Sequence, residues 1–179
     1  MVLRSIWRKI VQARSRDKWT VFYFVAAETA DTVVVATRLS RYCAYLVAQK
    51  PELLPDHRAW TEELYEGVVQ EVARVLARCA GTVVRYERAA ACLGGSMNAT
   101  LRKAAELGRQ LTNELGGDEE AVWKVLARFW AELIIYLAPS ENVTAHAKSL
   151  HRGGEFITVL WALLGHAGIV SRGLLIKHA

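Results

Sequence analysis

The chain has 179 residues, of which 53% are hydrophobic and 23% are charged, with only three prolines. This length fits one domain or two small ones, and the composition excludes a disordered chain, a collagen-like repeat and a small disulfide scaffold. The net charge of +5 is unevenly distributed, because residues 1–18 hold six basic residues against one acid. The rest of the chain is electrically balanced, which excludes a basic nucleic-acid-binding body.

Residues 1–18 are expected to form a basic, amphipathic arm. Apolar side chains recur in it at three- and four-residue spacing, with basic side chains between them. The apolar residues are Leu3, Ile6, Trp7, Ile10 and Val11, and the basic ones include Arg4, Arg8, Lys9 and Arg14. Such a helix can lie in an anionic membrane surface, where each basic residue contributes about 1 kcal/mol. The alternatives are a mitochondrial presequence and a helix whose apolar stripe packs on the domain.

An ordinary membrane-spanning helix is not expected. No stretch of 18 or more residues is apolar throughout and free of charge, as such a helix requires. The nearest candidate, residues 19–37, contains Glu28 and Asp31. The other, residues 156–170, is too short and contains His166.

The first half of the chain has the apolar spacing of helices. Residues 20–50 are predicted to be helical up to Pro51, because proline disfavours helix in the residue before it. Residues 51–55 form a rigid connector, and residues 59–80 form the next helix. A break is expected at Gly81, followed by further helix up to residue 93.

The second half contains clear start and stop signals. Ser96 is expected to cap a helix that ends at Gly116 and Gly117. Asp118 should cap the next helix, which ends at Pro139. A short helix over 140–150, a turn at Gly153-Gly154 and a very apolar, central helix over 155–167 complete the pattern.

These patterns predict an all-α fold, a single-domain bundle of about six or seven helices. No period-two run of any length indicates a strand. The expected organisation is a basic arm over 1–18, a helical domain over 19–170 and a tail over 171–179. Cys43, Cys79 and Cys92 show no zinc-binding or redox spacing, so reduced thiols in an intracellular compartment are expected.

The C-terminal third carries a specific series of motifs. A tryptophan-rich helix is followed by His146-Ala-Lys-Ser-Leu150, by Gly153-Gly-Glu-Phe-Ile-Thr158, and by an apolar stretch that ends in His166-Ala-Gly168. This series resembles plant domain-of-unknown-function family 594. Residues 39–55 resemble an upstream motif of the same family, and 101–111 resemble a further helix less specifically. The resemblance covers roughly residues 33–168.

The resemblance implies a plant protein and a membrane context. Full-length members of family 594 carry this domain after a membrane-spanning region, family 4220, which this chain lacks. The chain then corresponds to a short member or a truncated gene product, and its basic arm stands where a full-length member leaves the membrane. The resemblance implies no activity, cofactor or catalytic residue.

One cluster of chemistry-bearing residues stands out. His146 and Glu155 flank the Gly153-Gly154 pair, and we call these four residues the polar corner. Imidazole and carboxylate groups suit zinc or a non-haem metal. However, His166 lies roughly 16 Å beyond Glu155 along a continuous helix, too far to share one ion. A structural role is therefore favoured, in which Glu155 caps or pairs near a helix start and His146 hydrogen-bonds it.

The favoured functional interpretation is a non-catalytic helical module. It would be intracellular, bind an anionic membrane surface through the arm and bind an unknown protein partner, without a metal or cofactor. The alternatives are a small ligand- or metal-binding enzyme that uses the polar corner, and a mitochondrial protein if residues 1–18 are a presequence. Nucleic acid is the least favoured partner, since only the arm could bind it.

Overall fold

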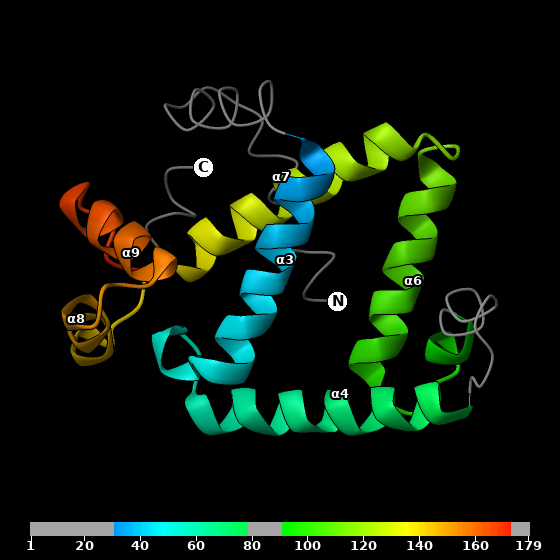
Figure 1. Cartoon of the computed structure of the whole chain (residues 1–179), viewed down its shortest axis with the longest axis horizontal. Coiled ribbons are helices and arrows are strands. Elements are labelled where there is room, and N and C mark those ends of the chain that lie inside the picture. The colour runs from blue at the N-terminus through cyan, green and yellow to red at the C-terminus, as the bar shows by residue number, and fades with distance from the viewer. Residues whose placement is uncertain (1–30, 79–90, 173–179) are drawn as a thin grey trace. The chain divides into compact units, whose positions relative to one another are not determined.

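The computed structural model describes residues 31–78 and 91–172, which form helices joined by turns, with no strand among them (Figure 1). The predicted all-α fold is confirmed. The basic arm over residues 1–18 and the break expected at Gly81 lie outside the described residues, as does the tail beyond residue 172.

The first described helix, α3 (Thr32–Gln49), begins and ends at residues that are explained by their neighbours in sequence. The carboxylate of Asp31 accepts a hydrogen bond from the Val33 amide at 3.0 Å and so caps its first turn. The helix ends just before Pro51, as the sequence predicts. Pro51 then opens a short 3-10 turn, η1 (Pro51–Leu53), where its missing N–H is tolerated.

The middle of the described chain holds α4 (Arg58–Arg78) and α6 (Ala99–Glu114). The prediction that Ser96 caps the later helix is wrong. Asn98 is the cap, since its side-chain oxygen accepts from the amides of Thr100 and Leu101 at 2.9 and 3.2 Å. A serine and an asparagine two residues apart are both good caps, so spacing alone did not separate them.

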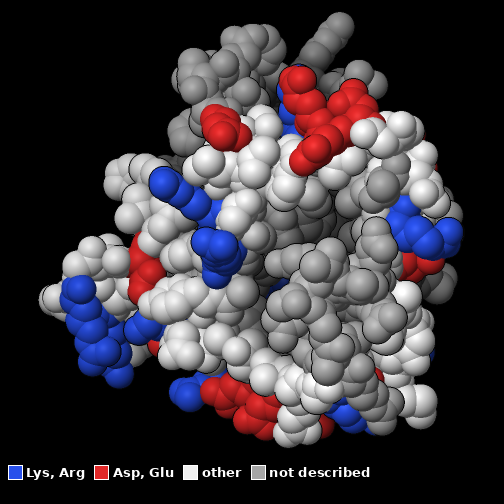
Figure 2. Space-filling view, turned by 45° about the vertical axis from the view of Figure 1, so that its right-hand side comes forward, with Lys and Arg blue, Asp and Glu red and all other residues white. Residues whose placement is uncertain are grey.

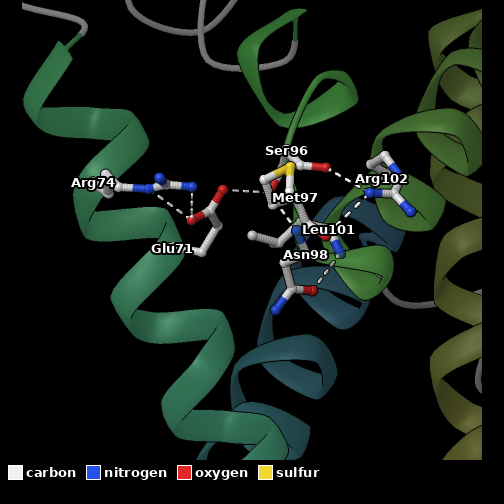
Figure 3. A network of polar contacts seen from close by, with 7 residues as sticks. All are labelled: Glu71, Arg74, Ser96, Met97, Asn98, Leu101 and Arg102. Carbon is white, nitrogen blue, oxygen red and sulfur yellow. Dashed lines mark hydrogen bonds and ion pairs between the residues drawn. The ribbon is translucent and has the colours of Figure 1, made fainter.

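Ser96 instead joins the turn before α6 to α4 (Figure 3). Its buried hydroxyl donates to a carboxylate oxygen of Glu71 at 2.6 Å and accepts from the Asn98 amide at 3.0 Å. Arg74 pairs with the other oxygen of Glu71. Arg102 donates to the carbonyls of Ser96 and Met97 at 2.8 and 3.1 Å, which fixes the turn from its other side.

Three helices follow in the C-terminal third: α7 (Glu119–Leu137), α8 (Val143–His151) and α9 (Phe156–His166). Asp118 caps α7, as predicted, by accepting from the Ala121 amide at 3.1 Å. Helix α8 begins at Val143 because the Asn142 side chain caps it, accepting from the Ala145 amide at 3.2 Å.

The helix predicted over residues 155–167 is present as α9, but the prediction that it is central is wrong. Only Ile157, Thr158 and Leu164 of α9 are buried. Phe156, Val159 and Leu163 are 50%, 47% and 61% exposed. A uniformly apolar helix gives no periodicity from which to read its buried face, so its hydrophobicity alone suggested full burial.

The described residues divide into two compact units. Unit 1 contains residues 31–55 and 123–172, and unit 2 contains residues 56–78 and 91–122. The core of unit 1 joins segments far apart in sequence: Leu46, Leu53, Leu54, Ala138, Ile157 and Leu164. The proposed boundaries at residues 18 and 170 stay predictions.

Candidate functional site

The polar corner lies in unit 1, where α8 turns into α9 (Figure 1). The turn is a Schellman motif, in which the Gly153 amide donates to Leu150 O at 3.2 Å and the Gly154 amide donates to Ser149 O at 2.9 Å. Gly153 and Gly154 adopt φ angles of 99° and 77°, which side chains disfavour. The glycine pair therefore sets the direction in which α9 leaves α8.

His146 is fully buried on the inner face of α8. Its Nδ1 lies 3.1 Å from the Thr158 hydroxyl of α9, which donates in turn to the Ser149 hydroxyl at 3.2 Å. Its ring stacks on Trp161, with the centroids 4.6 Å apart and the planes within 4°. The Trp161 indole donates to the Ser140 carbonyl at 3.0 Å. These contacts hold α8 against α9.

Burial determines the charge of the His146 ring. Nδ1 and the Thr158 hydroxyl share one hydrogen bond, whose direction depends on which ring nitrogen carries the proton. Nε2 is buried without a hydrogen-bond partner. Burial lowers the pKa of His146, because a charged imidazolium would lose its hydration there. The ring is therefore neutral at pH 7.

Glu155 occupies the N-cap position of α9, but its side chain does not cap that helix. One carboxylate oxygen accepts from the Tyr45 hydroxyl at 2.8 Å and the other from the Tyr42 hydroxyl at 3.3 Å. The Tyr42 hydroxyl also accepts from the Ile157 amide at 3.1 Å. Tyr42 therefore satisfies a donor in the first turn of α9 from a different helix.

The pKa values of Tyr42 and Tyr45 are both raised. Burial, with the adjacent Glu155 carboxylate, raises the pKa of Tyr42 to about 12, against the opposing effect of the Ile157 amide. The hydrogen bond to Glu155 is the main cause that raises the pKa of Tyr45. A phenolate at either position would face the carboxylate, so the protonated forms are favoured.

The predicted hydrogen bond between His146 and Glu155 does not form. His146 faces inward to Thr158, while Glu155 faces the tyrosines of α3. The partners of Glu155, Tyr42 and Tyr45, lie 113 and 110 residues before it in sequence. The one available signal was that the two tyrosines, three residues apart, share a helix face.

The arrangement supports a structural role for the polar corner. Both carboxylate oxygens of Glu155 and Nδ1 of His146 have protein partners, and His146 is shielded from solvent. Within residues 31–78 and 91–172, no three His, Cys, Asp or Glu residues lie close enough to hold a metal ion. In the same part of the chain, no helix is long and apolar enough to cross a membrane.

A second feature of unit 1 is an exposed apolar surface. Phe156, Val159 and Leu163 lie at three- and four-residue spacing, so they form a single stripe on α9. The stripe continues onto α3 through ring contacts, because Tyr42 stacks on Tyr45 and meets Phe156 edge-on, each with centroids 5.9 Å apart. We call Tyr45, Phe156, Val159 and Leu163 the α9 face.

The protein is thus all-α, and the polar corner connects α8 to α9 and α9 to α3. Residues 116–169 match the model of a family of proteins of unknown function, DUF594. The predicted resemblance to family 594 is confirmed over this segment, which contains the whole corner and α9. No curated protein and no solved structure matches the chain. The upstream resemblance over residues 39–55 stays a prediction, although that stretch lies in unit 1 with the DUF594 helices α8 and α9.

Proposed function

We propose that this chain is a non-catalytic helical module that binds an anionic membrane surface through residues 1–18 and holds a partner protein there. The observation that carries the proposal is the separation of charge. The arm holds Arg4, Arg8, Lys9, Arg14, Arg16 and Lys18 against Asp17 alone. Its apolar residues, with Ile6, Trp7 and Ile10 at the centre, supply the surface that would enter the lipid interface.

Charge in the described units supports the same proposal. The described residues of unit 1 contain eight basic and five acidic residues, whereas those of unit 2 contain six basic and ten acidic ones. The positive charge therefore lies in the arm and in the unit that carries the DUF594 helices α8 and α9. Anionic headgroups attract such clusters over about one Debye length.

The alternative, a small ligand- or metal-binding enzyme at the polar corner, has less support. A ligand there would have to displace two tyrosine hydroxyls from Glu155 or break the buried contact between His146 and Thr158. A presequence role for residues 1–18 is distinguished by import and cleavage, which would remove the arm.

Vesicle binding tests the proposal. The full chain should co-sediment with vesicles of phosphatidylcholine and phosphatidylserine, and bind more weakly at higher salt. Reversing two charges in the arm, with Arg8→Glu and Lys9→Glu, should abolish most of that binding. The control, Lys103→Glu with Arg109→Glu, makes the same charge change at exposed positions of unit 2. Equal losses in both double variants would contradict attachment through the arm.

A further inference from the structure

The α9 face is large for an exposed apolar surface on a packed helix. Phe156, Val159 and Leu163 are each about half exposed, although each lies on a helix whose opposite side is in the core. Apolar side chains scattered singly on a surface are ordinary. Here three exposed apolar side chains lie on one stripe of α9, and the stacked pair of Tyr42 and Tyr45 continues that stripe onto α3. A contiguous apolar surface of this kind indicates a site that binds another apolar surface.

Basic side chains without an ion pair lie on α3 and at the end of α8, the two helices in contact with α9. Arg38 and Arg41 precede Tyr45 by seven and four residues, so all three lie along one side of α3. Lys148 and Arg152 lie at the end of α8, just before the turn into Phe156. All four are exposed, and none takes part in an ion pair within the described part of the chain.

Four other arginines form ion pairs. Arg58, Arg74 and Arg109 of unit 2 each pair with a glutamate three or four residues away, and Arg128 of α7 pairs with Glu132. Two acids interact with Tyr45 of the α9 face, Glu155 and Glu52, and Glu155 is bound by tyrosine hydroxyls and not by a cation. Figure 2 shows basic side chains gathered over the α8 end of unit 1.

We propose that the α9 face is a second membrane-docking surface, on which Phe156, Val159 and Leu163 enter the interface of an anionic bilayer while Arg38, Arg41, Lys148 and Arg152 bind lipid phosphates. Charge complementarity selects this occupant, since exposed apolar side chains with unpaired cations on the neighbouring helices match an apolar layer beneath anionic headgroups. Tyr45 suits the boundary, because its ring is apolar and its hydroxyl is polar.

This inference rests on the proposed function and extends it, because the chain would bind the anionic membrane through two surfaces, the arm and the α9 face. A single amphipathic segment binds a membrane reversibly, and a second linked contact raises the overall affinity without requiring either to be strong. The arm and the α9 face are separable by mutation, so each can fail without the other.

The test compares two valines of nearly equal exposure. Val159 of α9 is 47% exposed and Val69 of α4 is 45% exposed, and both lie within helices. In the full chain, Val159→Asp should weaken binding to vesicles that contain phosphatidylserine by about tenfold, because an apolar contact is lost and a charge must be desolvated. Val69→Asp should leave binding unchanged. Circular dichroism and thermal melting verify that both variants fold.

A second pair of variants tests the basic residues next to the α9 face. Lys148→Glu should weaken binding to anionic vesicles and reduce its dependence on salt, whereas Lys103→Glu, an exposed lysine of unit 2, should do neither. Hydrogen exchange with vesicles present should slow in residues 156–166 of the wild-type chain. These results together would support docking through α9.

Four outcomes separate this inference from the proposed function. If the arm variant abolishes binding and Val159→Asp has no effect, the inference is overturned and the arm alone attaches the chain. If Val159→Asp abolishes binding and the arm variant has no effect, the inference stands and attachment through the arm fails. If the wild-type chain does not bind vesicles, both the proposed function and this inference are overturned. If it instead forms a dimer that Val159→Asp dissociates, a second copy covers the α9 face.

Discussion

The Tyr42 hydroxyl of α3 accepts a hydrogen bond from the Ile157 amide of α9 at 3.1 Å, across 115 residues of sequence. Helices usually satisfy their first amides with a side chain just before their start. Glu155 stands at that position, but its carboxylate binds Tyr42 and Tyr45 instead. The start of α9 therefore depends on α3, which ties the DUF594 segment to an upstream helix.

Removing the Tyr42 hydroxyl should destabilise unit 1. Tyr42→Phe leaves the Ile157 amide without its partner and frees one oxygen of Glu155. We expect the free energy of unfolding to fall by about 1–2 kcal/mol, measured by urea denaturation. The control is Tyr45→Phe, which removes a more exposed hydroxyl and should cost less than about 1 kcal/mol. If both variants lost the same free energy of unfolding, the hydrogen bond from the Ile157 amide to Tyr42 would add nothing to stability.

The turn into α9 requires glycine because of its backbone angle and not because of crowding. A Cβ at Gly153 would meet no atom within 4 Å, but φ is +99° there. Gly153→Ala should therefore cost about 1–2 kcal/mol of unfolding free energy. Gly108, inside α6, also has no atom within 4 Å of an added Cβ and has no positive φ.

Gly108→Ala is thus the matched control, and it should stabilise the protein by up to about 1 kcal/mol. Chemical denaturation of the two variants beside the wild type measures both effects. A stabilising Gly153→Ala would show that the turn does not hold its left-handed geometry in solution.

Local rules predicted much of the fold, because the relevant partners are close in sequence. The end of α3 before Pro51, the cap at Asp118 and the glycine turn after α8 all follow from neighbouring residues. The partners of Glu155 could not be predicted in this way, since they lie on a distant helix. The exposure of α9 was also missed, because a helix that is apolar all round has no polar side to mark its surface.

The buried His146 should make stability depend on pH. Its folded-state pKa is lowered by burial, so the unfolded chain binds a proton first as the pH falls. The stabilisation is therefore complete above the ordinary histidine pKa of about 6.5 and is lost as the pH falls towards the lowered value. The measurement is the free energy of unfolding at several values between about pH 7 and about pH 5.

The contribution of His146 is isolated with a variant. His146→Phe keeps a ring against Trp161 but cannot titrate, so its stability should fall less steeply over that pH range. If His146→Phe kept the wild-type slope, the pKa of His146 would not be lowered in the folded state.

The thiols provide an independent check on the packing of α3. Burial raises the pKa of Cys43 to about 11, whereas Cys92 is exposed. At about pH 8, roughly one Cys43 thiol in a thousand is ionised, and alkylating agents react with the thiolate. Iodoacetamide should therefore label Cys92 well before Cys43 in the folded chain, as measured by mass spectrometry of the digested peptides. In denaturant both should react at similar rates, and fast labelling of Cys43 without denaturant would contradict the position of α3 in the core.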